Sequence, residues 1–184
     1  MVLRFKFIAP LFALAFAAVM TASGANANPE NTLYMDLKDG RVVIALRPDL
    51  APKHVAQIKK LVRKGFYDGL TFHRVISGFM AQTGDPKGDG TGGSDLPNIP
   101  AEFSKAPFKR GAVGAARTGD PNSANSQFFI CFEDASHLNG QYTLFGQVVE
   151  GMEFVDRIKK GRDGSGKVFN PDKIIKMRVA ADVR

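Results

Sequence analysis

One short segment places a cationic side chain among apolar and amide side chains. It spans residues 72–85 and reads FHRVISGFMAQTGD. Because side chains alternate along a strand, Arg74 and Ile76 would share one face while His73 and Val75 take the other. A guanidinium stays protonated at all relevant pH values and donates up to five hydrogen bonds. The segment predicts a cation fixed beside an apolar patch, which fits electrostatic catalysis or an ordinary surface arginine beside the core.

Histidines offer a second kind of chemistry. His54, His73 and His137 fall in a predicted helix, a predicted strand and a loop. They lack the close ligand spacing of zinc sites, and the chain has no GxSxG elbow for a serine nucleophile. We therefore expect no metal and no cofactor. A zinc hydrolase built on the three histidines is kept as an alternative that predicts bound metal and sensitivity to chelators.

A glycine-rich stretch at residues 88–93, GDGTGG, matches the GxGxxG pattern of dinucleotide-binding loops. Such a loop needs a strand before it and a helix after it to direct backbone amides at a pyrophosphate. Here Asp85-Pro86-Lys87 precedes and Ser94-Asp95-Leu96-Pro97 follows, so neither element is predicted. The stretch instead predicts a surface loop whose glycines adopt positive φ.

The amino-terminal residues have the features of an export signal. Arg4 and Lys6 precede an almost wholly apolar run from Ile8 to Met20, and residues 25–27, Ala-Asn-Ala, fit the small-x-small cleavage pattern. The run is shorter than the roughly 20 residues of a membrane-spanning helix. We expect residues 1–27 to be a cleavable signal peptide rather than an anchor. Residues 28–184 would form a single domain, exported and located in the periplasm, without a membrane segment.

Hydrophobic periodicity predicts many short strands and two helices. Alternation or short apolar runs predict strands at residues 33–37, 41–46, 70–76, 79–83, 111–116, 127–132, 142–149 and 175–183. Helical spacing predicts one helix from Pro52 that stops at Gly65, and another from Met152 to Lys160. This arrangement is typical of a mainly antiparallel barrel or sandwich.

Charge and cysteine content narrow the possible partners. The formal net charge is +7, and the densest basic cluster, at residues 59–64, falls at a predicted helix end, where it complements the helix dipole. No stacking aromatics alternate with these charges, so we expect no nucleic-acid partner. Cys131 is the one cysteine, which excludes an internal disulfide. Its apolar surroundings predict a buried strand residue, with a free reactive thiol as the alternative.

Four sequence blocks together carry a family resemblance. They are FHRVISGFMAQTGD at residues 72–85, GTGG at 90–93, SQFFIC at 126–131 and LFGQVVEGM at 144–152. In their order and spacing, the chain resembles the cyclophilins over roughly Leu33 to Arg184. The resemblance implies a closed eight-stranded antiparallel barrel capped by two α-helices, and peptidyl-prolyl cis-trans isomerase activity on proline-containing unfolded or partly folded polypeptides. It also implies a monomer of the bacterial periplasmic branch.

The resemblance assigns roles to individual residues. It implies that Arg74 is catalytic and stabilises the twisted amide without covalent chemistry. It implies that the substrate groove is lined by Phe79, Met80, Gln82, Ala116, Arg117, Gln127, Phe129, Leu138 and Tyr142. Tyr142 stands where many relatives have histidine. A rival within the same fold is a binding module, a proline-peptide adaptor or holding chaperone with little turnover, although a pure binder needs no guanidinium at the prolyl nitrogen.

Three departures from the family pattern bear on the site. His137 stands where cyclosporin-sensitive eukaryotic members have tryptophan, so cyclosporin binding is expected to be weak. Residues 117–121, RTGDP, are one residue longer than the eukaryotic stretch and resemble the bacterial branch. Thr83 replaces a usual glycine. Because arginine does not titrate near neutrality, we expect a flat pH profile, whereas a titration near pH 6.5 would favour His73 or His137.

Overall fold

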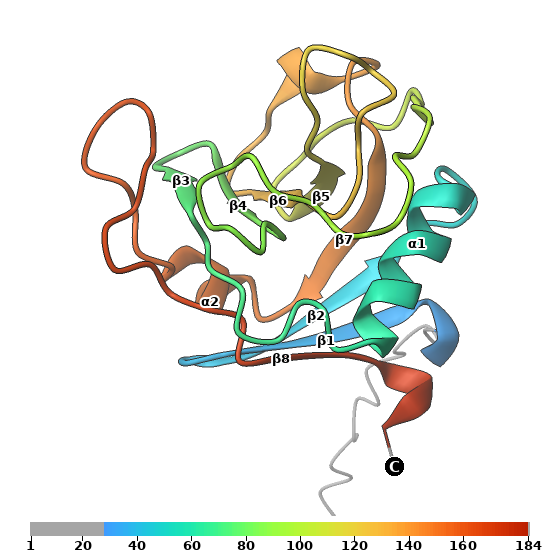
Figure 1. Ribbon diagram of the computed structural model, residues 1–184, viewed down its shortest axis with the longest axis horizontal. Coiled ribbons are helices and arrows are strands. Elements are labelled where there is room, and N and C mark those ends of the chain that lie inside the picture. Colours follow the sequence, from blue (N-terminus) through green and yellow to red (C-terminus); the bar gives the residue numbers. More distant parts are fainter. Residues whose placement is uncertain (1–27, 184) are drawn as a thin grey trace, which may run out of the picture.

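The computed structural model describes residues 28–183. Eight strands form one antiparallel sheet in the order β3-β4-β6-β5-β7-β2-β1-β8, which curls into a half-barrel (Figure 1). The elements are, in chain order, η1 (Pro29–Asn31), β1 (Thr32–Leu37), β2 (Gly40–Leu46), α1 (Pro52–Arg63), β3 (Arg74–Ile76), β4 (Met80–Thr83), β5 (Ala112–Ala115), β6 (Phe128–Cys131), η2 (Ser136–Leu138), β7 (Leu144–Glu150), α2 (Met152–Asp156), β8 (Lys176–Val179) and η3 (Ala180–Asp182). The mainly β architecture with two α-helices is as predicted. The predicted signal peptide lies outside the described residues.

The expected closed barrel is wrong in this structure. Strands β3 and β8 are the two edges of the sheet, and within the described residues no ladder joins them. Instead, the backbone of residues 69–75 bonds irregularly to residues 166–174, the segment that leads into β8. Two isolated bridges, Thr71 with Lys173 and Arg74 with Lys167, are part of this contact. The sheet is therefore open, with a loop rather than a strand pairing along the β3 edge.

Three predicted elements are shorter than expected. The strand predicted at residues 70–76 is regular only from Arg74, because the preceding backbone pairs with the loop described above. The helix predicted to Lys160 ends at Asp156, where tighter i to i−3 bonds begin, and the amide of Lys159 then bonds to the Asp172 side chain. The last strand ends at Val179, because η3 follows it.

The two faces of the strands β3, β4, β6 and β5 belong to different apolar clusters. Inward-facing residues, such as Val75, Ala81 and Ile130, join the main core inside the curled sheet. Their neighbours along the same strands, such as Met80 and Phe129, join a second cluster on the outer face. This division follows from the two-residue period of a strand. The alternation of buried Val75 with half-buried Arg74 and Ile76 was predicted from the sequence and is confirmed.

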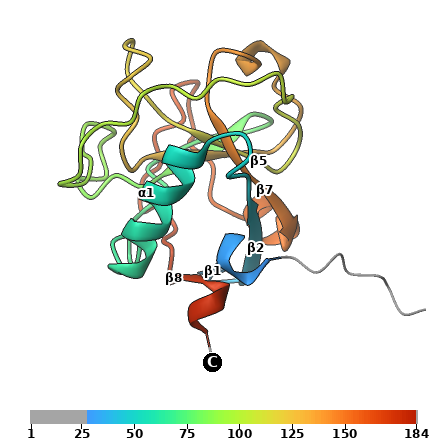
Figure 2. The ribbon, with the colours of Figure 1, turned by 90° about the vertical axis from the view of Figure 1, so that its right-hand side faces the viewer.

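Helix α1 packs against β8 and β7 (Figure 2). Its first turn is capped by a residue distant in sequence: the Glu102 carboxylate accepts from the backbone amides of Lys53 and His54, both at 3.0 Å. It also lies 2.7 Å from Nδ1 of the buried His54. Burial lowers the pKa of His54 by more than Glu102 raises it, so a neutral imidazole donates to the carboxylate. No helix within residues 28–183 is both long and apolar enough to cross a bilayer.

Candidate active site

A single row of residues crosses the outer face of the sheet. Antiparallel pairing places Arg74 opposite Gln82, Gln82 opposite Phe129, and Phe129 opposite Gly114. The isolated bridge extends the row by placing Lys167 opposite Arg74. Directly opposed residues on neighbouring strands point to the same face, with their Cβ atoms about 5 Å apart. The row therefore leads from two cations, through an amide, to an aromatic ring.

Neutral oxygen atoms hold the guanidinium of Arg74. Its Nη1 donates to Oε1 of Gln82 at 3.2 Å, and its Nε donates to the backbone carbonyl of Ser165 at 3.1 Å. No carboxylate lies within ion-pair distance of Arg74 in the described part of the chain. The side chain is thus oriented by two bonds, and its positive charge is not cancelled by a partner. Such a donor can act on a substrate atom.

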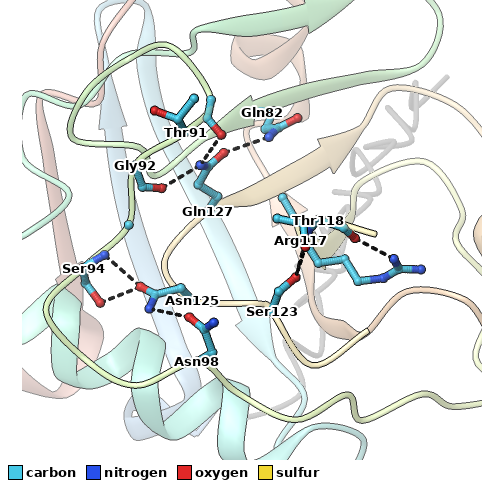
Figure 3. A pocket seen from close by; sticks show the side chains of 13 residues that line it. Gln82, Thr91, Gly92, Ser94, Asn98, Arg117, Thr118, Ser123, Asn125 and Gln127 are labelled. Carbon is cyan, nitrogen blue, oxygen red and sulfur yellow. Dashed lines mark hydrogen bonds between the residues drawn. The ribbon is translucent and has the colours of Figure 1, made fainter. Parts of the chain in front are cut away.

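The second residue of the row is itself oriented by a third. Gln82 donates from Nε2 to Oε1 of Gln127 at 2.9 Å, and Gln127 donates to the backbone carbonyls of Gly90 and Gly92 at 3.0 and 2.8 Å. Figure 3 shows this chain of bonds between β4 and the glycine-rich loop. Because each amide has one oriented neighbour on either side, Gln82 must present its oxygen to Arg74. This series of hydrogen bonds fixes the orientation of the acceptor, Gln82, as well as that of the donor, Arg74.

The glycine-rich loop folds around a buried carboxylate. Asp85 accepts from the backbone amides of Lys87, Asp89 and Gly90 at 2.8, 3.1 and 2.6 Å. Gly88 and Gly90 have φ of +71° and +92°, which confirms the predicted need for glycine in this loop. The loop contains no helix in which backbone amides could hold a pyrophosphate. In this structure it supplies two carbonyl groups to Gln127.

An apolar cluster lies beside the row on the same face. Its members include the buried Met80, Phe129 and Leu138, with the partly buried Phe79, Ala116 and Tyr142 packed against them. Ring contacts orient two of these: Phe79 lies 5.2 Å from the His137 ring, and Tyr142 meets Phe129 edge to face at 5.9 Å between centroids. The cluster offers a surface of aromatic and aliphatic groups within reach of Arg74.

Gly114 allows the ring of Phe129 to lie flat on the sheet. A Cβ atom at Gly114 would lie 2.6 Å from the Phe108 ring and closer still to that of Phe129. Glycine inside a strand often marks such a close approach. This signal is present in the sequence, as a glycine within the apolar run at residues 111–116, but the sequence-based prediction of the site did not include Gly114.

The side chain of Arg117 contacts Tyr142, another of the predicted groove residues. Its guanidinium stacks over the Tyr142 ring, 4.5 Å from the centroid, and donates to the carbonyls of Thr118 and Gln141 at 2.8 and 2.9 Å. The resemblance placed Arg117 in the lining of the substrate groove, and the structure shows what its side chain contacts there. This side chain fixes the orientation of Tyr142, the residue that stands where many relatives have histidine.

A hollow of about 610 Å³ adjoins this row (Figure 3). Its lining includes the side chains of Gln82, Gln127, Arg117 and Asn125 and residues 90–93 of the glycine-rich loop. Asn125 is fixed by bonds from Ser94 and to Leu96. The lining is polar and largely uncharged, and its volume suits a side chain or a short segment of extended polypeptide.

The histidines and the cysteine do not assemble a site of their own. In residues 28–183, no group of three His, Cys, Asp or Glu side chains is arranged to hold a metal ion. His73 is buried behind Arg74, and burial lowers its pKa against the opposing effect of Asp85. Cys131 is buried on β6, as predicted, and burial raises the pKa of its thiol to about 12. A thiol with this pKa is a poor nucleophile at neutral pH.

The predicted site residues gather on one side of the molecule. Arg74, Gln82 and Gln127 form the bonded chain, and the apolar members and Arg117 surround it. Sequence reasoning missed Ser165, which accepts from Arg74 through its backbone, and Lys167, which lies opposite Arg74. Neither could be found from local pattern, because both lie in a loop that approaches β3 only in the folded chain.

Comparisons with known proteins agree with this geometry. Residues 32–179 match the family model for cyclophilin type peptidyl-prolyl cis-trans isomerase/CLD. The chain is 61% identical over 188 residues to a probable peptidyl-prolyl cis-trans isomerase of Brucella suis, covering 96% of this chain and 95% of the relative. It is 45% identical over 133 residues to peptidyl-prolyl cis-trans isomerase B of Bacillus subtilis, covering 71% and 92% respectively.

Solved structures show the same fold. A cyclophilin from Hirschia baltica matches with a TM-score of 0.77 at 28% identity, covering 86% of this chain and 77% of that one. A Cryptosporidium parvum cyclophilin type isomerase, solved in the presence of the dipeptide Ala-Pro, matches with a TM-score of 0.74 at 28% identity, covering 80% and 98%. The chain therefore belongs to the cyclophilin-type peptidyl-prolyl cis-trans isomerases. It is an isomerase of Xaa-Pro peptide bonds.

Proposed function

We propose that this isomerase acts on exported proteins during folding, and that Arg74 lowers the barrier without covalent chemistry. The observation that carries the mechanism is the guanidinium of Arg74, which Gln82 and Ser165 orient and which forms no ion pair with a carboxylate of residues 28–183. The fixed donor lies beside the apolar cluster that would hold a proline ring. Donor and apolar surface together suit a reaction in which a bond rotates and none is broken.

The chemistry of the rotation explains why a cation helps. Twisting an Xaa-Pro bond breaks amide resonance, with a barrier of about 18–20 kcal/mol and uncatalysed times of tens to hundreds of seconds. In the twisted state the prolyl nitrogen regains a lone pair that can accept a hydrogen bond. A donor beside it stabilises the transition state more than either planar ground state. Arg74 is the donor in this proposal.

The apolar cluster supplies the fixed point for the rotation. Phe79, Met80, Phe129 and Leu138 would hold the proline ring, while Gln82 and backbone groups at Ala116 and Arg117 would hold the residues before it. One side of the bond then stays still as the other turns. The edge contact between Phe129 and Tyr142 and the stacking of Arg117 on Tyr142 support this role, because they restrict the movement of the surrounding side chains.

The proposed mechanism predicts a flat pH profile. Guanidinium groups stay protonated between pH 6 and 9, and burial lowers the pKa of His73, which favours its neutral ring. We expect kcat/KM to vary less than about twofold across that range. A rate that rose or fell with a midpoint inside that range would count against this mechanism and would indicate that a titrating side chain takes part in the reaction.

The setting of the reaction is also part of the proposal. The residue pattern of positions 1–27 supports a cleavable signal, export and a periplasmic location. The clients would be proline-containing unfolded or partly folded polypeptides, and the protein would act as a monomer that binds neither nucleic acid nor membrane. Cyclosporin would bind weakly, since His137 replaces the tryptophan of cyclosporin-sensitive relatives.

Isomerisation of Xaa-Pro peptides by wild type and Arg74→Ala tests the mechanism. Loss of one preorganised donor to a developing charge typically costs about 10²- to 10³-fold in rate, and we expect a loss of this size. Arg41→Ala is the matched control, because Arg41 is paired with Asp36 on an exposed surface. Equal rates for wild type and Arg74→Ala would refute the assigned role of Arg74. No turnover by wild type would instead favour the binding module.

A further inference from the structure

Two cations face each other across the bridge at the edge of the sheet. Arg74 and Lys167 are directly opposed. On either side of this pair, the backbone amide of Val75 donates to the carbonyl of Gly166 at 2.7 Å, and the backbone amide of Val168 donates to the carbonyl of His73 at 3.1 Å. These bonds make Arg74 and Lys167 a non-hydrogen-bonded pair, the kind in which Cα atoms lie about 4.5 Å apart and side chains are closest. Like charges in such a position destabilise the pairing.

No ion pair in the described part of the chain relieves this repulsion. Arg74 and Lys167 take part in none of the ion pairs among residues 28–183. Elsewhere in the sheet an arginine forms an ion pair with the residue opposite it, as Arg41 does with Asp36 at 2.7 Å. The bonds to Arg74 come from an amide and a carbonyl, which orient the side chain and leave its charge in place. An anion bound between Arg74 and Lys167 would offset the electrostatic repulsion between them.

The surroundings leave room for such an anion. A hollow of about 410 Å³ is lined by Arg74, Lys167 and Arg117, with Asp89 as its one carboxylate. Asp89 is occupied by the amide and hydroxyl of Thr91, both bonded to its Oδ1 at 2.8 and 2.7 Å. These bonds orient Asp89 and leave its negative charge in place, so three cationic side chains outnumber one carboxylate in the lining. The hollow attracts negative charge.

We propose that this hollow is a subsite for a carboxylate side chain of the substrate, an Asp or Glu close to the isomerised proline. The proposal rests on the proposed function, because Arg74 is shared between the subsite and the reaction. A carboxylate carried by the bound polypeptide arrives at high effective concentration, so even a weak ion pair adds to affinity. Lys167 supplies the charge that is not engaged at the prolyl nitrogen. Lys167 is thus a specificity-determining residue.

The carboxylate contact is expected to act on binding rather than on rotation. It forms equally in the ground state and the transition state, and uniform binding lowers KM while leaving kcat alone. The contact lies at an exposed edge, where Lys167 is accessible to solvent, so its effect is modest and falls with salt. We expect a preference for Glu over the isosteric Gln of about threefold to tenfold in kcat/KM at low ionic strength, and most of it in KM.

Isomerisation of paired peptides, followed by NMR exchange, tests the subsite in the full chain. Each pair differs by Glu or Gln at one position, with the variable residue placed in turn one or two positions before or after proline. The readout is the ratio of kcat/KM for the Glu peptide to that for the Gln peptide. The ratio cancels any loss of folded enzyme. Wild type, Lys167→Gln and Lys173→Gln are compared at low and high salt.

Lys173→Gln is the matched control, since Lys173 is an exposed lysine on the same loop, at the isolated bridge with Thr71 and outside the hollow. The proposal expects a Glu preference at one or more positions in wild type and Lys173→Gln, its fall to near unity in Lys167→Gln, and its decrease at high salt. A ratio near unity at every position in wild type, or one that Lys167→Gln leaves intact, would overturn the subsite. Absence of turnover with both peptides would overturn the proposed function instead.

Inorganic phosphate distinguishes a substrate carboxylate from a free anion. Added phosphate is compared with chloride at equal ionic strength, using the Glu and Gln peptides. If the subsite is filled by the substrate, the Glu preference persists in millimolar phosphate. A preference abolished by low millimolar phosphate, with the Gln peptide unaffected, would show that a free anion is the better ligand and would overturn the assignment to a substrate side chain.

Discussion

Two basic regions of this molecule use their charges in opposite ways. At the end of α1, a helix-end cluster of Lys59, Arg63 and Lys64 meets carboxylates, with Arg63 bonded to both Glu30 and Asp182 at 2.8 and 2.9 Å. In the groove, Arg74 and Arg117 bond to carbonyl and amide oxygens, Arg117 also stacks on Tyr142, and Lys167 lies opposite Arg74. None of these three cations takes part in an ion pair among residues 28–183. We call these three the groove cations.

The difference lies in the partners and not in the residue types. A carboxylate neutralises a cation and contributes to stability, while neutral acceptors orient it and leave its field available to a ligand. The effect on Glu30 shows the first case: bonds from Arg63 and Lys59 lower the pKa of that carboxyl to about 2. In our proposal, charge in the helix-end cluster supports the fold, and charge in the groove supports binding and catalysis. The following changes test that distinction.

Lys167→Glu would place a carboxylate beside a groove cation, as in the helix-end cluster. A carboxylate directly opposite Arg74 would pair with its guanidinium and draw it from the substrate. We expect kcat/KM for uncharged Xaa-Pro peptides to fall roughly tenfold, equivalent to about 1.4 kcal/mol, with an unchanged or slightly higher Tm. Peptide isomerisation and thermal denaturation measure the two effects. A wild-type rate in Lys167→Glu would show that the charge of Arg74 does not need to be free.

Gln82→Ala would remove the acceptor that orients Arg74 and keep its charge. The bond from Nη1 of Arg74 and the link to Gln127 would both be lost. Full loss of a hydrogen bond to a charged group, about 1.5–3 kcal/mol, would correspond to roughly 10- to 150-fold. Because the bond to Ser165 remains, we expect a smaller fall of about fivefold to twentyfold in kcat. Gln147→Ala, which removes a glutamine bonded to the Arg110 carbonyl, is the control. Equal kcat values in both variants would contradict the orienting role.

Arg63→Gln tests the helix-end cluster in the same way. The variant loses its ion pairs with Glu30 and Asp182, which lie at the surface and are screened by water. We expect Tm to fall by less than about 4 °C while the isomerisation rate stays within error of wild type. A substantial change in rate with an unchanged Tm would mean that the two regions are not separate in function.

The smallest predicted effect is the pH dependence of the Tm difference between wild type and Arg63→Gln. The folded-state pKa of Glu30 is lowered from 4.5 to about 2, so its ion pairs contribute fully above about pH 4.5. Their contribution is lost as pH falls toward 2. The Tm difference between wild type and Arg63→Gln should therefore shrink between pH 5 and pH 3. A difference that grew over this range would contradict the pairing of Arg63 with Glu30.

Local pattern predicted the parts of the fold that depend on neighbouring residues. The alternation that places Val75 in the core and Arg74 outside follows from strand geometry alone. Helix α1 begins at Pro52 as predicted and ends at Arg63, just before the predicted stop. The candidate groove residues came from the family resemblance, and the structure gathers them on one face.

Long-range pairing explains what the sequence did not predict. The open edge of the sheet, the bond from Arg74 to Ser165 and the opposition of Lys167 all depend on a loop about ninety residues away. That loop has no alternating pattern and forms isolated bridges rather than a strand. The capping of α1 by Glu102 is equally nonlocal. Such contacts are set by how the whole chain packs, so no short window of sequence contains them.

Separating peptide binding from rotation in Arg74→Ala tests the central claim most directly. NMR exchange on a labelled Xaa-Pro peptide gives both the Kd and the isomerisation rate of the bound peptide. If Arg74 acts on the twisted amide, Arg74→Ala keeps the Kd within about threefold of wild type while the bound-state rate falls about 10²-fold or more. A bound-state rate equal to that of wild type, with any loss confined to Kd, would contradict the account.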